Sequence, residues 1–470
     1  MLLLYRRQKR LKWLEVMDMD RPILEELKKS PRVESGLFDN ARKLALYPEN
    51  RESLNLGRYF VEKTHAKLEQ LIVNTNFENM DDRSPARSDV STRELNDTAT
   101  APGLLTNTLF GHFMPFDSCT PFQNLTSLRL HRVSLRHCAD TWCKVIDFNK
   151  IHSLHVYHCS GTDSLLGQLS RARSLPESLQ ALEIQHKDNY ENETSVALDG
   201  LLCLLSGLTI LTIDLQNVKT LPAVASIVRH GKTLEQLNIH CSNESLSSPL
   251  ISDMSCDADE LVYETEDFDK ICSATERLEQ LSCAWPTRSL IRSASDDWAA
   301  FEGSMSKLRK LVTLHITTWP SNKPSGSLLP RLVYEQLLQG AATRLFELAA
   351  NRKSLEPPIL ADQPDSSDAA TETAQLLPHS KLRLIAFGIS DKIYEREDSQ
   401  NQILYLRSSA FDAEGRSKIH ATPVGWCARR YLEPRSEILD FVLARESRLP
   451  CRGERGDMES RFGFNVDDEL

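Results

Sequence analysis

The sequence predicts an α/β fold in which a curved parallel sheet lies inside and helices lie outside. Three observations support this prediction. The tetrad Leu-Glu-Gln-Leu occurs at 68–71, 234–237 and 278–281. A wider pattern, apolar-x-x-apolar-x-apolar, includes both leucines of each tetrad and recurs along the chain. Segments with helical periodicity stand between the copies, so strands and helices are expected to alternate.

The wider pattern marks the predicted strands. It starts at residues 11, 41, 68, 125, 151, 179, 208, 234, 278, 311 and 382. Its fourth and sixth positions, such as Leu128 and Leu130, point to the same side of a strand. From 125 to 234 the starts are 26, 28, 29 and 26 residues apart, which is the leucine-rich-repeat period. An ordinary α/β domain would give single matches but not four such gaps in succession. We therefore predict a leucine-rich-repeat solenoid with irregular repeats and disordered inserts.

Helices are predicted between the strands, for example at 221–231 and 296–308. Their apolar faces are Leu221, Val224, Ala225 and Val228, with Gly231 ending the helix, and Trp298, Phe301, Met305 and Leu308. The uncharged stretch 200–213 predicts a buried helix end, closed by Gly207, and then a strand. Strands stack about 4.8 Å apart and helices about 8–10 Å apart, so the stack must curve with the strands inside.

Composition shifts divide the chain further. Residues 1–79 hold the N-terminal repeats, 80–108 a disordered insert, and 109–320 the central repeats. Within the central part, 242–269 carries nine acidic and no basic residues, and is either a solvated loop or an acidic docking segment. Residues 321–380 comprise a helix at 331–350 and a linker. The last repeat and a C-terminal cap occupy 381–447, with a hairpin of 402–411 and 416–426 around Gly415 and a closing helix at 434–445. Residues 448–470 form a mobile tail.

Charge and cysteine usage exclude several classes of protein. The net charge of −10 over 470 residues argues against binding to nucleic acid or to an anionic membrane. The apolar stretch 200–213 carries no charge but has only 14 residues, whereas a membrane span needs about 20. Eleven cysteines, an odd number without a C-x-x-C pair, predict free thiols in a reducing compartment, either cytoplasm or nucleus.

One cluster of residues resembles a zinc site in composition. The stretches 131–143 and 151–159 contain four cysteine or histidine residues each. Their spacing matches no closed zinc site, and Cys159 stands at the ninth repeat position, which is normally buried. The sequence also lacks a nucleophile elbow, a P-loop and a G-x-G-x-x-G loop. We expect no metal, no cofactor and no enzymatic activity; a catalytic module would require a clustered triad or a metal in the folded chain.

The strand positions between the buried anchors are expected to line the concave face. Such a face must be polar in any case, but its residue types favour protein contacts, since Arg, His, Tyr and Trp are frequent and lysines are few. Positive and negative groups both occur, which suits a protein or peptide partner of mixed charge. The predicted partner-binding residues are Arg129, His131, Arg132, His155, Tyr157, His158, Glu183, Gln185, Asp214, Asn238, His240, Trp285 and His315.

The irregular, interrupted repeats over about 11–440 resemble the repeat region of fungal F-box-like leucine-rich-repeat proteins. The resemblance implies a substrate receptor of a ubiquitin ligase. In that family a helical F-box precedes the repeats, whereas here the first predicted strand begins near Leu11. We therefore expect docking to a ligase adaptor only if an F-box lies upstream of Met1. The alternative is a leucine-rich-repeat scaffold with no link to a ligase.

Overall fold

A computed structural model gives the fold. It describes residues 11–16, 41–48, 51–75, 103–113, 121–171, 175–188, 193–243, 259–286, 295–318, 331–350, 381–388, 403–411 and 417–424, with the single positions 25, 29, 38 and 40. The chain divides into two compact units. The first contains strands β1 to β7 and the second contains β8 to β14, and each is described separately below.

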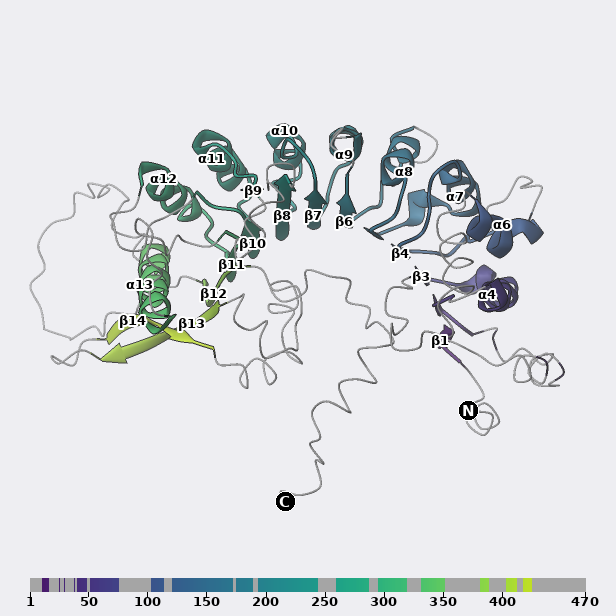
Figure 1. The fold of residues 1–470 in the computed structure, drawn as a ribbon, viewed down its shortest axis with the longest axis horizontal. Helices are drawn as coiled ribbons and strands as arrows, with labels where there is room; N and C mark the ends of the chain where they lie inside the picture. Colours follow the sequence, from purple (N-terminus) through teal and green to yellow (C-terminus); the bar gives the residue numbers. More distant parts are fainter. Residues whose placement is uncertain are drawn as a thin grey trace, which may run out of the picture. The chain divides into compact units, whose positions relative to one another are not determined.

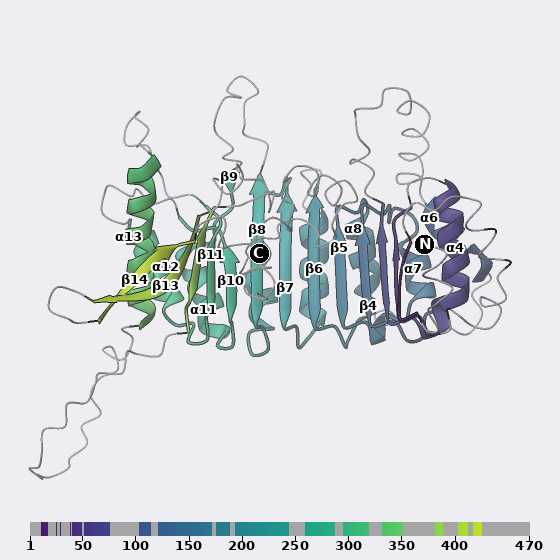
Figure 2. The same cartoon turned by 90° about the horizontal axis from the view of Figure 1, so that it is seen from below.

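The sheet of the first unit is parallel and follows chain order (Figure 2). Its strands are β1 (Trp13–Val16), β2 (Lys43–Leu46), β3 (Gln70–Asn74), β4 (Ser127–His131), β5 (Ser153–Tyr157), β6 (Ala181–Lys187) and β7 (Ile210–Gln216). Each strand starts where the apolar pattern predicts. The fourth-position leucines stand opposite one another from strand to strand, in the order Leu14, Leu44, Leu71, Leu128, Leu154, Leu182 and Leu211.

Helices cover one side of this sheet (Figure 1). They are α4 (Arg51–Thr64), α6 (Leu104–Phe110), α7 (Ala139–Val145), α8 (Thr162–Leu169) and α9 (Glu193–Leu204), with short 3-10 turns at His65–Lys67, Gly111–Phe113 and Phe148–Lys150. The core lies between the two layers. Leu125, Leu128 and Leu130 are fully buried there, and each such side chain contributes about 1.5–3 kcal/mol through burial. The turn after α9 uses Gly207 at φ +84°, as the sequence predicts.

The second unit begins with four parallel strands: β8 (Gln236–Asn243), β10 (Gln280–Cys283), β11 (Thr313–Ile316) and β12 (Leu384–Phe387). β9 (Asp259–Glu260) pairs antiparallel with β8. The helices α10 (Val224–Val228), α11 (Thr265–Ala274) and α12 (Asp296–Met305) lie on one side of the strands (Figure 1). In α12 the predicted apolar face, Trp298, Phe301 and Met305, is buried, and Ser295 caps the helix by accepting from Trp298 N.

The second unit ends in an antiparallel pair, β13 (Ile403–Phe411) and β14 (Ser417–Pro423), as the hairpin prediction requires. The helix α13 (Arg331–Ala350) packs against β14. Its side chains satisfy the outer edge of the strand: Gln339 Nε2 donates to Ala421 O at 2.7 Å, and Ala421 N donates to Thr343 Oγ1 at 3.1 Å. Capping of this kind removes backbone groups that would otherwise attract another strand.

Two boundaries and the buried face of one helix differ from the sequence predictions. The acidic loop is shorter than 242–269, because β9 and the start of α11 fall inside it; acidic residues there form the first turn of a helix, where the helix dipole favours them. The insert is shorter than 80–108, because α6 begins at Leu104. In α10 the buried residues are Ser226 and Ile227, not the predicted face. Only five residues are helical there, too few for a periodic pattern to orient the segment.

The glycine at 231 has a different role from the predicted helix stop. A Cβ atom at this position would lie 2.4 Å from Ala274 O, at the end of α11. Glycine is therefore required by the close approach of a neighbouring helix end. The predictions for residues 80–102, the linker after α13, Gly415, the closing helix at 434–445 and the tail at 448–470 lie outside the described residues.

Candidate interaction surface

The candidate site is the face of each sheet opposite the described helices, called here the open face (Figure 1). Side chains alternate along a strand, so the fifth and seventh pattern positions point to this face when the fourth and sixth point to the core. In the first unit the open face presents Arg129, His155, Glu183 and Thr212 from the fifth positions and His131, Tyr157, Gln185 and Asp214 from the seventh.

A chain of polar contacts crosses strands β5 and β6 on the open face. Nδ1 of His155 lies 3.0 Å from Glu183 Oε2, and the Tyr157 hydroxyl donates to the same carboxylate oxygen. The other ring nitrogen, Nε2, lies 2.5 Å from Ser153 Oγ. These contacts fix the imidazole between one carboxylate and one hydroxyl. The negative charge of Glu183 therefore already has two donors within the protein.

The resulting order, Ser153–His155–Glu183, has the composition of a catalytic triad. A triad also needs donors for an oxyanion, which are commonly backbone N–H groups. Here the N–H groups of His152 and Ser153 both donate to Thr126 O, at 2.8 and 3.1 Å, because they lie in the sheet. Neither is available to an oxyanion, so we derive no catalytic step from this chain of contacts.

His131 occupies the next strand of the same face. Its Nδ1 lies 2.7 Å from Asn74 Oδ1, an acceptor that places the proton of the neutral ring on Nδ1. Burial, together with the positive charges of Arg132, His158 and Arg129, lowers the pKa of His131 from 6.5 to about 3. His131 is therefore a neutral hydrogen-bond donor at physiological pH.

Two cationic side chains of this face, Arg129 and Lys43, interact electrostatically with each other. Arg129 is half-buried, and its Nε atom has no hydrogen-bond partner. Lys43, on β2, lies with its ammonium 4.0 Å from the centre of the Trp13 ring. Burial and the charge of Arg129 lower the pKa of Lys43, while Glu15 opposes the shift. Lys43 and Asn74 were not predicted from the sequence as contact residues, although both occupy open-face positions, the third and the seventh, of earlier repeats.

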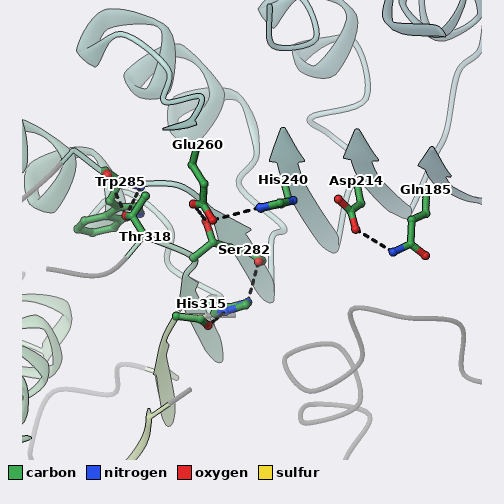
Figure 3. A network of polar contacts seen from close by, with 10 residues as sticks. Gln185, Asp214, His240, Glu260, Ser282, Trp285, His315 and Thr318 are labelled. Atoms are coloured by element: carbon green, nitrogen blue, oxygen red, sulfur yellow. Dashed lines mark hydrogen bonds and ion pairs between the residues drawn. The ribbon is translucent and has the colours of Figure 1, made fainter. Parts of the chain in front are cut away.

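The negative end of the face lies on β6 and β7. Gln185 Nε2 donates to Asp214 Oδ2 at 2.9 Å, and Figure 3 shows the two side chains pointing toward each other from neighbouring strands. Both are buried, at 4% and 6% exposure. Like Glu183, Asp214 therefore has its carboxylate engaged by a neighbour.

The open face of the second unit carries its own polar contacts (Figure 3). His240 Nε2 lies 3.1 Å from Glu260 Oε1, and Thr317 donates to Glu260 Oε2 at 2.8 Å. Ser282 Oγ lies 2.8 Å from His315 Nδ1, and His315 Nε2 lies 2.7 Å from Gly388 O. Glu260, assigned from sequence to the acidic loop, instead lies on β9 and contacts His240 on β8 and Thr317, the residue after β11. Asn238 is half-buried on the same face.

Most predicted contact residues are less exposed than a concave surface implies. His131, His155, Tyr157, Gln185, Asp214, His240 and His315 are all buried. Arg129, Arg132, His158, Glu183 and Asn238 are half-buried. The physical reason is that most of these long polar side chains contact or hydrogen-bond their neighbours across adjacent strands. The polar groups that a partner can reach therefore belong mainly to these five half-buried residues.

Trp285 does not belong to this surface. It is fully buried and packs its ring against Phe268, Trp298 and Phe301, with centroid distances of 6.1, 4.9 and 5.6 Å. The assignment was wrong because alternation, if continued, places the eighth position on the same side as the buried fourth and sixth, and Trp285 lies beyond the end of β10 at Cys283. The tryptophan turns toward the helices and joins the core.

The eighth positions that follow β4 and β5 are turns. Arg132 and His158 have φ values of +55° and +51°, in the left-handed region. Cys159 follows and is fully buried, as its ninth position predicts. Its sulfur accepts from Val133 N and donates to Tyr157 O, both at 3.4 Å, and burial raises the pKa of the thiol to about 12. This thiol links two consecutive turns.

Within the described ranges, no group of three or more His, Cys, Asp or Glu residues is placed to hold a metal ion. The same ranges contain no helix that combines the length and apolar character of a membrane span.

Fold and surface together define an α/β protein of strand-and-helix units, with its polar chemistry on one face of each sheet. The chain matches no protein-family model, and no curated protein matches its sequence.

Proposed function

We propose that this protein is an irregular leucine-rich-repeat protein that binds a protein or peptide partner through its open face. The observation that supports the proposal is the in-register array of Arg, His, Tyr and acidic side chains on strands β4 to β7. Groups held in fixed rows on neighbouring strands can recognise an extended surface without rearranging, which lowers the entropic cost of binding.

We propose substrate recognition for a ubiquitin ligase as the biological setting, on the resemblance to F-box-like repeat proteins. A scaffold without a ligase is the alternative. The two differ in one observable: a substrate receptor associates with a ligase adaptor and promotes ubiquitination of its partner, whereas a scaffold does neither. Co-purification of an adaptor with the protein encoded by the complete gene separates them.

Proximity labelling with the intact chain tests the binding function. The Arg129→Ala/Tyr157→Ala variant removes two open-face side chains and should lose the specifically labelled partner. Lys144→Ala/Asp140→Ala, which removes an exposed ion pair on α7, is the matched control and should retain it. The control should melt near the wild-type temperature, and the open-face variant, which removes the buried Tyr157, should melt lower but remain folded at the labelling temperature. Loss of the partner by the control as well, or retention by both variants, would contradict the assignment of the open face.

A further inference from the structure

The charged groups on the open face of the first unit are not equally satisfied. Glu183 accepts from His155 and Tyr157, and Asp214 accepts from Gln185. Arg129 differs: its Nε is buried without a hydrogen-bond partner, and no carboxylate of the described residues forms an ion pair with it. The acidic groups thus have donors within the protein, while the guanidinium retains donor capacity.

Neighbouring groups make the surroundings of Arg129 positive. Lys43 and His131 both have lowered pKa values, to which the charge of Arg129 contributes after burial. Arg132 and His158 act on His131 in the same direction. Only Glu15, on the outermost strand β1, opposes the shift at Lys43. An anion bound here would relieve this repulsion.

Apolar residues beside Arg129 strengthen its interaction with a bound anion. Ala45 and Ile72 occupy the fifth positions of β2 and β3, the same row as Arg129 on β4. Both are buried and contact each other, and Tyr47 packs against them. Apolar neighbours lower the local dielectric constant, so a charge-assisted hydrogen bond to Arg129 gains strength.

We propose that Arg129 and Lys43 form a subsite for a carboxylate side chain of an acidic partner segment. The subsite rests on the proposed function and narrows it: the sequence suggests a partner of mixed charge, whereas the satisfied state of Glu183 and Asp214 selects an acidic one. The guanidinium supplies directional donors, and the ammonium supplies a second positive charge two strands away. The overall charge of −10 disfavours non-specific binding of anions, so capture depends on this local group.

Fluorescence anisotropy of a fluorescein-labelled hexaglutamate peptide, titrated with the full chain at low ionic strength, tests the subsite. Arg129→Gln should weaken binding about tenfold, because charge-assisted hydrogen bonds are lost. Lys43→Gln, with a more distant charge, should weaken it about threefold. Lys144→Gln is the control, since it removes the same charge from α7 on the other side of the sheet. Its affinity should equal that of the wild type.

Several results would overturn the subsite: no binding of hexaglutamate by the wild type, equal loss in the Lys144→Gln control, or equally tight binding of an oligothymidylate, which would indicate a nucleic acid as the anion. The proposed function is separable from this result. A partner that is lost with Arg129→Ala/Tyr157→Ala but is not displaced by hexaglutamate would sustain protein binding and refute the acidic subsite. Binding of hexaglutamate without capture of a protein partner would do the reverse.

Discussion

His131 gives the most direct test of the electrostatics of the open face. The perturbation is His131→Asn, which removes the titrating ring and retains a side-chain donor for Asn74 Oδ1. The pKa of His131 is about 3 in the folded protein and 6.5 in the unfolded chain. The unfolded state therefore binds a proton between these values while the folded state does not, so acid favours unfolding. The contribution to stability is complete above about pH 6.5 and is lost progressively as the pH falls toward 3.

At pH 5 the two pKa values correspond to about 2 kcal/mol of lost stability from this one group. The measurement is the free energy of unfolding in urea at pH 7.5 and pH 5, for the wild type and for His131→Asn. All other side chains are the same in the two proteins, so their contributions to the pH dependence cancel in the comparison. The variant should lose about 2 kcal/mol less than the wild type on acidification. His152→Asn, at an exposed position, is the control and should behave as the wild type. An equal pH dependence in all three proteins would refute the argument that cations surround a buried, neutral His131.

The remaining predictions concern the core, the thiols and Ser153. Leu211→Asp places a charge in the core shared by β6 and β7 and should lower the free energy of unfolding by more than about 3 kcal/mol. Thr212→Asp, on the open face, should lower it by less than about 1 kcal/mol, and thermal unfolding distinguishes the two variants. Cys203 is exposed and should react with iodoacetamide in the native protein, whereas the buried Cys159 should react only after denaturation. Peptide mapping identifies the modified thiol, and modification of Cys159 before Cys203 would contradict the prediction. Ser153 should not be labelled by a fluorophosphonate, because the N–H groups of His152 and Ser153 are bonded within the sheet; labelling that is abolished by His155→Gln would establish a nucleophile and refute this prediction.

The strands were predictable because each depends on a local rule, the spacing of apolar residues, that can be read directly from the sequence. Leu128 and Leu130 are two residues apart and both buried, and the same spacing recurs in every parallel strand of both units. A parallel sheet with one face against helices requires this alternation, and a constant register then follows from stacking similar units. The buried turn residue Cys159 was predictable for the same reason, since its place in the pattern is fixed.

The partners of the open-face residues were not predictable in the same way. Tyr157 and Glu183 are 26 residues apart and meet only because β5 and β6 pair in one register. The position of Glu260 was even harder to predict, because a two-residue strand after an acidic stretch has no periodic pattern. Trp285 was assigned to the wrong side: it lies two residues past the end of β10, at an even pattern position, and alternation places even positions with the buried anchors. Sequence patterns specify which side of a strand a residue occupies, but contacts across strands depend on the register and the strand ends.

The position of the polar groups on interior strands limits what the face can do. An interior strand of a parallel sheet commits its N–H and C=O groups to both neighbours, so recognition depends on side chains alone. Side chains that satisfy one another, such as Gln185 with Asp214, contribute shape and rigidity and gain little from a partner. Arg129 retains a buried donor without an acceptor, and a ligand that supplies the acceptor removes the cost of leaving it unpaired. A partner therefore gains more by bonding to Arg129 than to the paired side chains of this face, and the positive charge of Arg129 favours an acidic partner.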